Sequence, residues 1–194
     1  MLCAIMKKYL LLIATALSCG FALPAHAQSK IVLGGDSIER TCYEKALYGN
    51  TGTKQAIDIC DNAIENFTTH KNRPANHINR GVLLMRSGKL EAARRDYEKA
   101  IELNPDLRDA YVNYGALLIQ MQDYDAALTA LNKAVEGEHT KHLHEALYNR
   151  AIAYDRQDRF REAYLDLKRA LELRPEWDDA KRAISRYSVA KKSG

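Results

Sequence analysis

The stretch His77-Ile78-Asn79-Arg80-Gly81-Val82-Leu83-Leu84 decides the fold of this chain, because two further copies of it follow. The second copy, Tyr111-Val112-Asn113-Tyr114-Gly115-Ala116-Leu117-Leu118, begins 34 residues later. The third copy, Leu147-Tyr148-Asn149-Arg150-Ala151-Ile152-Ala153-Tyr154, begins after a further 36 residues. Self-similarity at such a period indicates a stack of small repeated units rather than one or two independent domains.

Each repeated unit is predicted to contain two helices. Apolar residues recur at i, i+3, i+4 and i+7 in both halves of a unit, which is typical of an amphipathic helix of about thirteen residues. Short polar segments between the halves indicate tight turns. One position of the first helix carries a small residue in every unit: Gly81, Gly115 and Ala151. Because Gly inside a helix costs roughly 0.5–1 kcal/mol relative to Ala, we expect the two helices to cross closely there.

The units resemble the tetratricopeptide repeat in residue spacing and type. The second helix of each unit carries two alanines seven residues apart: Ala93/Ala100, Ala127/Ala134 and Ala163/Ala170. Pro105 and Pro175 close the first and third units. Three clear units, 74–107, 108–141 and 144–177, cover about half of the chain. The resemblance implies an all-α fold, a right-handed α-solenoid of antiparallel helix pairs.

Weaker units are predicted at both ends of the three clear ones. Residues 37–73 form a degenerate repeat-like hairpin, in which Glu44 stands where the small residue should be. Cys42 and Cys60 lie nine residues on either side of the predicted turn, so an antiparallel hairpin would bring them together as a disulfide. The alternative is a free thiol with a catalytic or metal-binding role, which no Cys-x-x-Cys spacing supports. Residues 178–194 are expected to form a capping helix over 178–188 and a basic tail.

The first 27 residues have the pattern of a secretory signal peptide. Lys7 and Lys8 precede a short apolar run, and Ala25-His26-Ala27 matches a small-x-small cleavage site. We expect cleavage after Ala27, a periplasmic protein, and a flexible lead over residues 28–36. Two alternatives are lipoprotein processing at Cys19 and an uncleaved membrane anchor, for which the run is short.

The charge that remains after cleavage argues against nucleic-acid binding. The whole chain has 29 basic and 25 acidic residues, and Lys7 and Lys8 leave with the signal peptide, so 27 bases face 25 acids. A net charge of +2 provides no broad cationic surface for nucleic acid. No membrane span is expected in the cleaved chain.

The candidate partner-binding residues are those expected on the concave side of the first helices. Asn79, Asn113 and Asn149 share one position in the three units, and a ladder of carboxamides could grip a peptide backbone through donors and acceptors. The alternative is that these amides bond within their repeats. The other candidates flank them along the same strip: Ile78, Val82, Met85, Val112, Ile119, Tyr148, Ile152 and Arg156. An apolar strip suits an extended or helical segment of another protein, unless a neighbouring repeat, the lead or a second copy occupies it.

A second pattern predicts structural ion pairs inside the first and third units. Arg80 and Arg150 stand where Leu is usual, and Asp96 and Asp166 follow each of them by sixteen residues. The second unit has Tyr114 in place of the arginine and no aspartate sixteen residues later. The arginine and the aspartate therefore occur together or not at all. We therefore expect an Arg–Asp pair that links the two helices of a unit.

The sequence carries no enzyme signature. It lacks a nucleophile elbow, a phosphate-binding Gly loop and a His-Glu-x-x-His zinc motif. His139, His142 and His144 crowd the loop between the second and third units and offer an alternative metal-binding role, but no rigid framework accompanies them. The sequence thus predicts a non-enzymatic adaptor or assembly factor without a cofactor. The other alternative is a structural, self-associating repeat protein.

Overall fold

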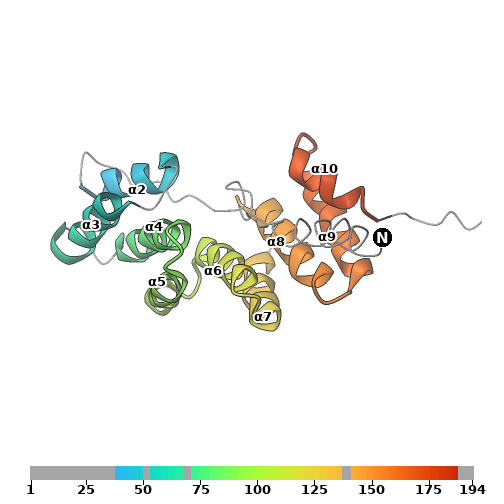
Figure 1. The fold of residues 1–194 in the computed structure, drawn as a ribbon, viewed down its shortest axis with the longest axis horizontal. Coiled ribbons are helices and arrows are strands. Elements are labelled where there is room, and N and C mark those ends of the chain that lie inside the picture. The colour runs from blue at the N-terminus through green and yellow to red at the C-terminus, as the bar shows by residue number, and fades with distance from the viewer. Residues whose placement is uncertain (1–37, 50–52, 68–70, 137–140, 188–194) are drawn as a thin grey trace, which may run out of the picture.

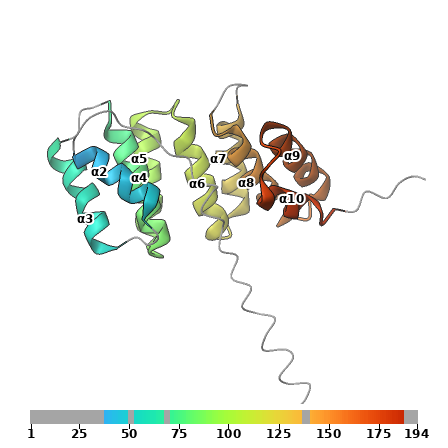
Figure 2. The same ribbon diagram turned by 90° about the horizontal axis from the view of Figure 1, so that it is seen from above.

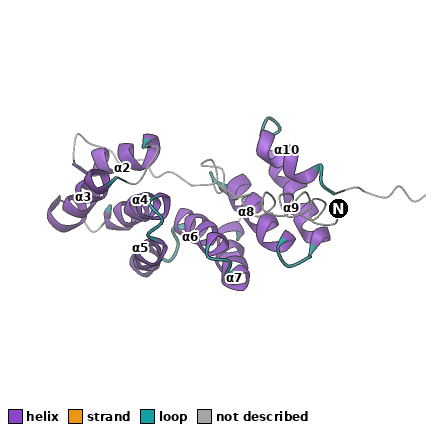
Figure 3. Ribbon diagram, in the orientation of Figure 1, coloured by secondary structure: helices purple, strands orange, loops and turns teal. Residues whose placement is uncertain are grey.

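The computed structural model describes residues 38–49, 53–67, 71–136 and 141–187, and within these ranges it contains helices and no strand (Figure 3). The all-α prediction is confirmed. In chain order the elements are α2 (Ile38–Tyr48), α3 (Lys54–Asn62), the π-helix η2 (Ala63–Phe67), α4 (Arg73–Arg86), α5 (Leu90–Leu103), α6 (Arg108–Gln120), α7 (Tyr124–Val135), α8 (Leu143–Asp155), α9 (Phe160–Leu173) and α10 (Asp178–Ile184).

The helices form antiparallel pairs that follow one another along the long axis of the molecule (Figures 1 and 2). The first helices of the three clear units, α4, α6 and α8, stand in one row, and α5 and α7 lie on its outer side (Figure 1). At the two ends, α2 and α10 project to the opposite, inner side of this row (Figure 1). We call α2 and α10 the arms, and the side of the row toward which they project the inner face.

Close helix crossing explains the small residue in the first helix of each unit. A Cβ atom on Gly81 would lie 2.6 Å from Cε1 of Tyr97, and one on Gly115 would lie 2.4 Å from Cγ of Leu131. Tyr97 and Leu131 come from the second helix of the same unit and are fully buried. Neither can withdraw without opening a space in a packed interior, so the glycines allow the helices their separation.

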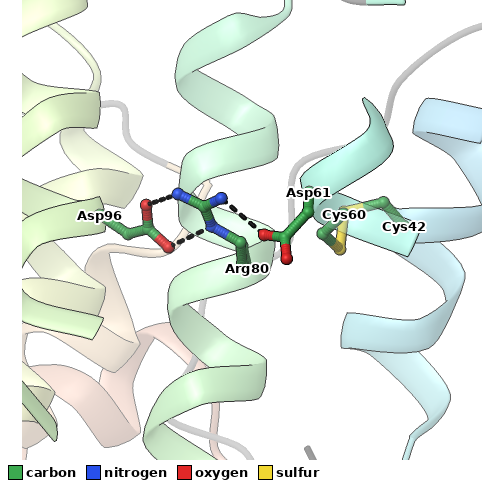
Figure 4. Close-up of a disulfide and its surroundings, with 5 residues drawn as sticks. All are labelled: Cys42, Cys60, Asp61, Arg80 and Asp96. Carbon is green, nitrogen blue, oxygen red and sulfur yellow. Dashed lines mark hydrogen bonds and ion pairs between the residues drawn. A yellow bond between two sulfur atoms is a disulfide. The ribbon is translucent and has the colours of Figure 1, made fainter. Parts of the chain in front are cut away.

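A disulfide occupies this crossing point in the N-terminal hairpin, as predicted. Cys42 and Cys60 are bonded, with their Cα atoms 4.8 Å apart and both side chains fully buried (Figure 4). Counting back 37 residues from the first clear unit, Cys60 stands in the place of Tyr97 and Cys42 in the place of Asn79. The covalent bond therefore links α2 and α3 near the point where, in the other pairs, a small residue of the first helix packs against a large side chain of the second.

The C-terminal helix is shorter than the sequence predicts. The helix expected over 178–188 ends at Ile184. Beyond it, the Ser185 hydroxyl donates to the Arg182 carbonyl, and the backbone N–H groups of Arg186 and Tyr187 donate three residues back rather than four. The predicted signal peptide, residues 1–27, and the predicted lead, residues 28–36, lie outside the described residues. Within the part of the chain that is described, no helix is both long and apolar enough to span a bilayer.

Candidate functional site

The inner face of the helix row is the candidate site, and its first third is covered by α2. Ile78, Val82 and Met85 of α4 are buried in one apolar cluster with Cys42 and Ala46 of α2. The Arg86 guanidinium at the end of α4 donates to the carbonyl oxygens of Ala46 (2.6 Å) and Gly49 (2.8 Å). These bonds satisfy carbonyls that the end of α2 leaves open. The disulfide-linked hairpin is thus fixed over the first repeat.

The last third of the inner face is covered by α10 and the residues on either side of it. The Tyr148 ring of α8 packs against Trp177, with ring centroids 4.6 Å apart. Asp155, at the end of α8, accepts a hydrogen bond from the Tyr187 hydroxyl and lies 3.6 Å from Nη2 of Arg186. Burial, together with this hydrogen bond, raises the pKa of Tyr187 above its ordinary value, so its hydroxyl stays protonated.

The part of the inner face between the arms belongs to α6. Its three inner residues, Val112, Ala116 and Ile119, have exposed fractions of 2%, 1% and 7%. Val112 packs with Ala134 of α7 and Ala146 of α8. These three residues form the floor between the arms. The floor is apolar and buried, rather than an open charged channel.

Most of the predicted partner-binding residues are buried. Of the eleven, Ile152 is half-buried, Arg156 is exposed and the remaining nine are buried. The three asparagines, expected as an accessible ladder, lie inside the repeats: Nδ2 of Asn113, for example, donates to the Asp109 carbonyl one turn earlier at 2.9 Å. Their position in the repeat explains the burial. Cys42 occupies the equivalent position of the N-terminal hairpin, and its side chain is bonded to Cys60 of α3, so this position faces the second helix of the unit. This buried placement favours the second of the two alternatives, bonding within the repeat, over an accessible ladder.

Both predicted arginine–aspartate pairs are present, and each is bidentate. Nε and Nη2 of Arg80 donate to the two carboxylate oxygens of Asp96 at 2.8 and 2.6 Å. Arg150 holds Asp166 in the same way, at 2.7 and 2.8 Å. Both aspartates are buried. The pairs lie away from the inner face and join the two helices of one unit, so their role is structural.

Each arginine also reaches back to the preceding unit, which the sequence pattern did not reveal. Nη1 of Arg80 donates to Asp61 of the hairpin at 2.6 Å (Figure 4), and Nη1 of Arg150 donates to Asn132 of α7 at 2.9 Å. In the middle unit the Tyr114 hydroxyl makes the equivalent bond to Glu98 of α5 at 2.8 Å.

The sequence does mark the three acceptors by a shared position. Each of them stands two residues before an alanine of the second half of its unit: Asp61, Glu98 and Asn132. The hydrogen bond and charge of Asp96, joined by Asp61, outweigh burial and raise the pKa of Arg80. Arg80 and Arg150 therefore each link three helices, and through Asp61 the degenerate hairpin is included, whereas Tyr114 links α6 to α5.

His142 and His144, the two histidines of the predicted loop that the structure describes, pack against neighbouring side chains rather than lying in solvent. Nδ1 of His142 lies 3.0 Å from Oε2 of Glu145, and both residues are buried. Burial lowers the pKa of His142, but the hydrogen bond and charge of Glu145 outweigh it and raise the pKa above 6.5. The His144 ring meets the edge of Trp177, with centroids 5.4 Å apart. No group of three or more His, Cys, Asp or Glu within the described ranges could hold a metal ion, and His139 lies outside them.

Comparisons with known proteins agree with this architecture. A family model described as tetratricopeptide repeat matches residues 76–107 and 144–176, and a second model of that description matches residues 96–129. The match to 96–129 starts within α5 and ends within α7, half a unit out of step with the others. This offset is expected in a solenoid, where the packing between units resembles the packing within them. A search of curated proteins gives no match.

Solved structures of similar fold are tetratricopeptide repeat proteins. MamA from Desulfovibrio magneticus RS-1 aligns with a TM-score of 0.61 and 21% identity, over 78% of this chain and 84% of that one. The Arabidopsis OM64 TPR domain aligns with a TM-score of 0.57 and 24% identity, over 61% of this chain and 96% of that one. YrrB, described as a TPR protein with an unusual peptide-binding site, aligns with a TM-score of 0.57 and 22% identity, over 68% and 66%. At these identities the likeness concerns the fold.

Proposed function

Because the chain is a tetratricopeptide repeat protein, we propose that it is a non-enzymatic adaptor or assembly factor that binds a segment of another protein on its inner face. The observation that carries this proposal is the accessible surface beside α6 and between the two arms (Figure 1), where Ile152 is half-buried and Arg156 is exposed. An inner face that carries an accessible aliphatic side chain between two projecting helices suits one extended or helical segment. The peptide-binding site of YrrB shows that a chain of similar fold can bind a peptide.

The partner is expected to contact the part of the inner face near α8. Ile152 is half-buried and Arg156 exposed, so these residues can meet a ligand without any change in the helices. Gln120, at the end of α6, is exposed beside them in the register of the repeats. This surface combines an aliphatic contact with a guanidinium and a carboxamide. It therefore suits an apolar segment that carries a carboxylate or free backbone carbonyls.

A pull-down from an envelope fraction with two matched variants tests this assignment. Ile152→Glu places a charge on the inner face, and Leu165→Glu places the same charge on the outer side of α9, where Leu165 is 53% exposed. Both changes affect apolar helix residues with access to solvent. We expect Ile152→Glu to lose a partner that the wild type and Leu165→Glu both retain. Loss with Leu165→Glu alone would move the binding surface to the outer face.

Export to the periplasm is the second part of the proposal. It is supported by the signal-peptide pattern of residues 1–27 and by the buried disulfide, which forms in oxidising compartments. N-terminal sequencing of the protein from its native cell checks it. Cleavage after Ala27 predicts Gln28 as the first residue, whereas a lipid-modified Cys19 would contradict this route.

A further inference from the structure

The side of α9 that faces away from α8 carries an exposed strip of charged and apolar residues. α9 packs on α8 through Ala163, Leu167 and Ala170, which are buried in clusters with residues of α8. Helical periodicity places five residues on the opposite side, and all of them are exposed: Arg161, Leu165, Lys168, Arg169 and Glu172. We call these five residues the outer stripe of α9. Leu165, at its centre, has an exposed fraction of 53%.

The outer stripe departs from the pattern of the two preceding units. Leu165 stands where α5 has Arg95 and α7 has Thr129, so an aliphatic side chain replaces a polar one on a surface that faces solvent. The position of Arg161 holds an acid in both earlier units: Glu91 and Asp125. Packing within the unit requires neither change, because neither position is buried. The third unit therefore has an exposed leucine and a reversed charge that the fold itself does not explain.

The cations of the outer stripe also differ from those of the earlier units in their pairing. Arg94 and Lys99 of α5 form ion pairs with glutamates one turn away, and Lys133 of α7 does the same. Three cations of the outer stripe have no ion-pair partner among the residues that the structure describes: Arg161, Lys168 and Arg169. Glu172 is the single acid of the stripe. The stripe thus carries three positive charges against one negative charge, around an exposed leucine.

Shape and charge together favour a flat anionic surface as the occupant of this stripe. A bound peptide is usually held in a groove or along the edge of a sheet, whereas the outer stripe lies on the convex side of one helix. α9 has 14 residues, and a helix of that length can lie along a plane for about 21 Å. Cations around an apolar side chain are typical of helices that lie on anionic bilayers. There the apolar side chain enters the headgroup boundary and the cations bind lipid phosphates.

We propose that the outer stripe of α9 docks the protein on an anionic phospholipid surface. Leu165 enters the boundary between headgroups and acyl chains, and the flanking cations bind the headgroup phosphates. Three cations and one leucine give a weak, reversible attachment, which added salt weakens further. Ile152 and Arg156, the residues assigned to a protein partner, are not part of the stripe. The docking therefore does not rest on the proposed function.

Vesicle sedimentation with two variants of equal charge tests the docking. The stripe variant is Arg161→Gln/Lys168→Gln/Arg169→Gln, and the matched control replaces three paired cations: Arg94→Gln/Lys99→Gln/Lys133→Gln. The vesicles contain phosphatidylglycerol and phosphatidylcholine in equal parts, or phosphatidylcholine alone. Each cation near an anionic membrane strengthens binding about fivefold, so we expect the stripe variant to bind the anionic vesicles at least about tenfold more weakly than the control.

Three results of this experiment would overturn the proposal. The first is equal binding of the anionic vesicles by the two variants, and the second is equal binding of both kinds of vesicle by the wild type. The third is binding of a soluble polyglutamate peptide in place of the vesicles, which would assign the stripe to an acidic polypeptide.

A reporter at the centre of the stripe makes the test independent of any other membrane attachment of the chain. An environment-sensitive fluorescent amino acid replaces Leu165 or, in the matched control, Thr129 at the equivalent exposed position of α7. With anionic vesicles we expect the emission from position 165 to shift to shorter wavelength and the emission from position 129 to stay unchanged. No shift at position 165, or an equal shift at both positions, would show that α9 does not face the lipid.

Discussion

Removal of the disulfide should loosen the N-terminal hairpin and leave the distal repeats intact. Cys42 and Cys60 are 18 residues apart, and closing a loop of that size removes an entropy of roughly 11 cal/mol/K from the unfolded chain, or about 3 kcal/mol near room temperature. The hairpin has little to replace this, because Glu44 stands where the other units carry a small residue at the helix crossing. In Cys42→Ala/Cys60→Ala we therefore expect local opening of α2 and α3 to become about a hundredfold more frequent.

Amide hydrogen exchange measures this effect helix by helix. Protection should fall in α2 and α3, and to a smaller degree in α4, whose inner residues α2 buries. Protection in α8 and α9 should not change, since a solenoid couples mainly neighbouring units. Wild type treated with a reductant under unfolding conditions and then refolded is the matched control, because it loses the bond and keeps both sulfur atoms. A loss of protection below about tenfold in the hairpin, or an equal loss in α9, would show that the disulfide does not stabilise the hairpin in this way.

Substitutions at four further positions test the packing and the buried charges. Gly81→Ala should lower the free energy of unfolding by about 1–2 kcal/mol in urea denaturation, because the new methyl group meets the buried Tyr97 ring; a gain in stability would show that the helices can separate freely. Tyr97→Phe should change it by less than about 0.5 kcal/mol, because the buried hydroxyl has no hydrogen-bond partner. Asp166→Ala leaves a guanidinium largely buried and should cost about 2–3 kcal/mol, with Asp166→Asn costing less; a cost under about 0.5 kcal/mol would mean that the pair is solvated. The raised pKa of His142 means that its pair with Glu145 stabilises the fold fully below pH 6.5 and loses this contribution as pH rises through the raised value; His142→Gln should flatten that part of the pH–stability curve, and an unchanged curve would contradict the buried pair.

The sequence predicts the repeat positions well because they describe contacts within one unit. Gly81 and Arg80 have their partners, Tyr97 and Asp96, sixteen residues later in the second helix. A fixed separation of this kind follows directly from a helix hairpin of known turn length. The disulfide is predictable for the same reason, since Cys42 and Cys60 lie symmetrically about one turn.

Contacts between units are harder to predict, because they depend on how each hairpin is rotated against the next. The bonds from Arg80 to Asp61 and from Arg150 to Asn132 belong to this class. So does the burial of the inner residues of α4 and α8 by the arms, where the sequence had predicted an open groove. Asn113 shows the limit clearly, because periodicity places it on a face of α6 but does not say what that face meets.

Site-specific photocrosslinking in cells tests the central claim, that the inner face binds a partner segment, most directly. A photoreactive amino acid replaces Ile152 on the inner face or, in the matched control, Leu165 on the outer side of α9. We expect an adduct of defined mass from position 152, formed with a contiguous segment of another protein and absent from position 165. An adduct from position 165 alone, or the same adducts from both positions, would contradict it.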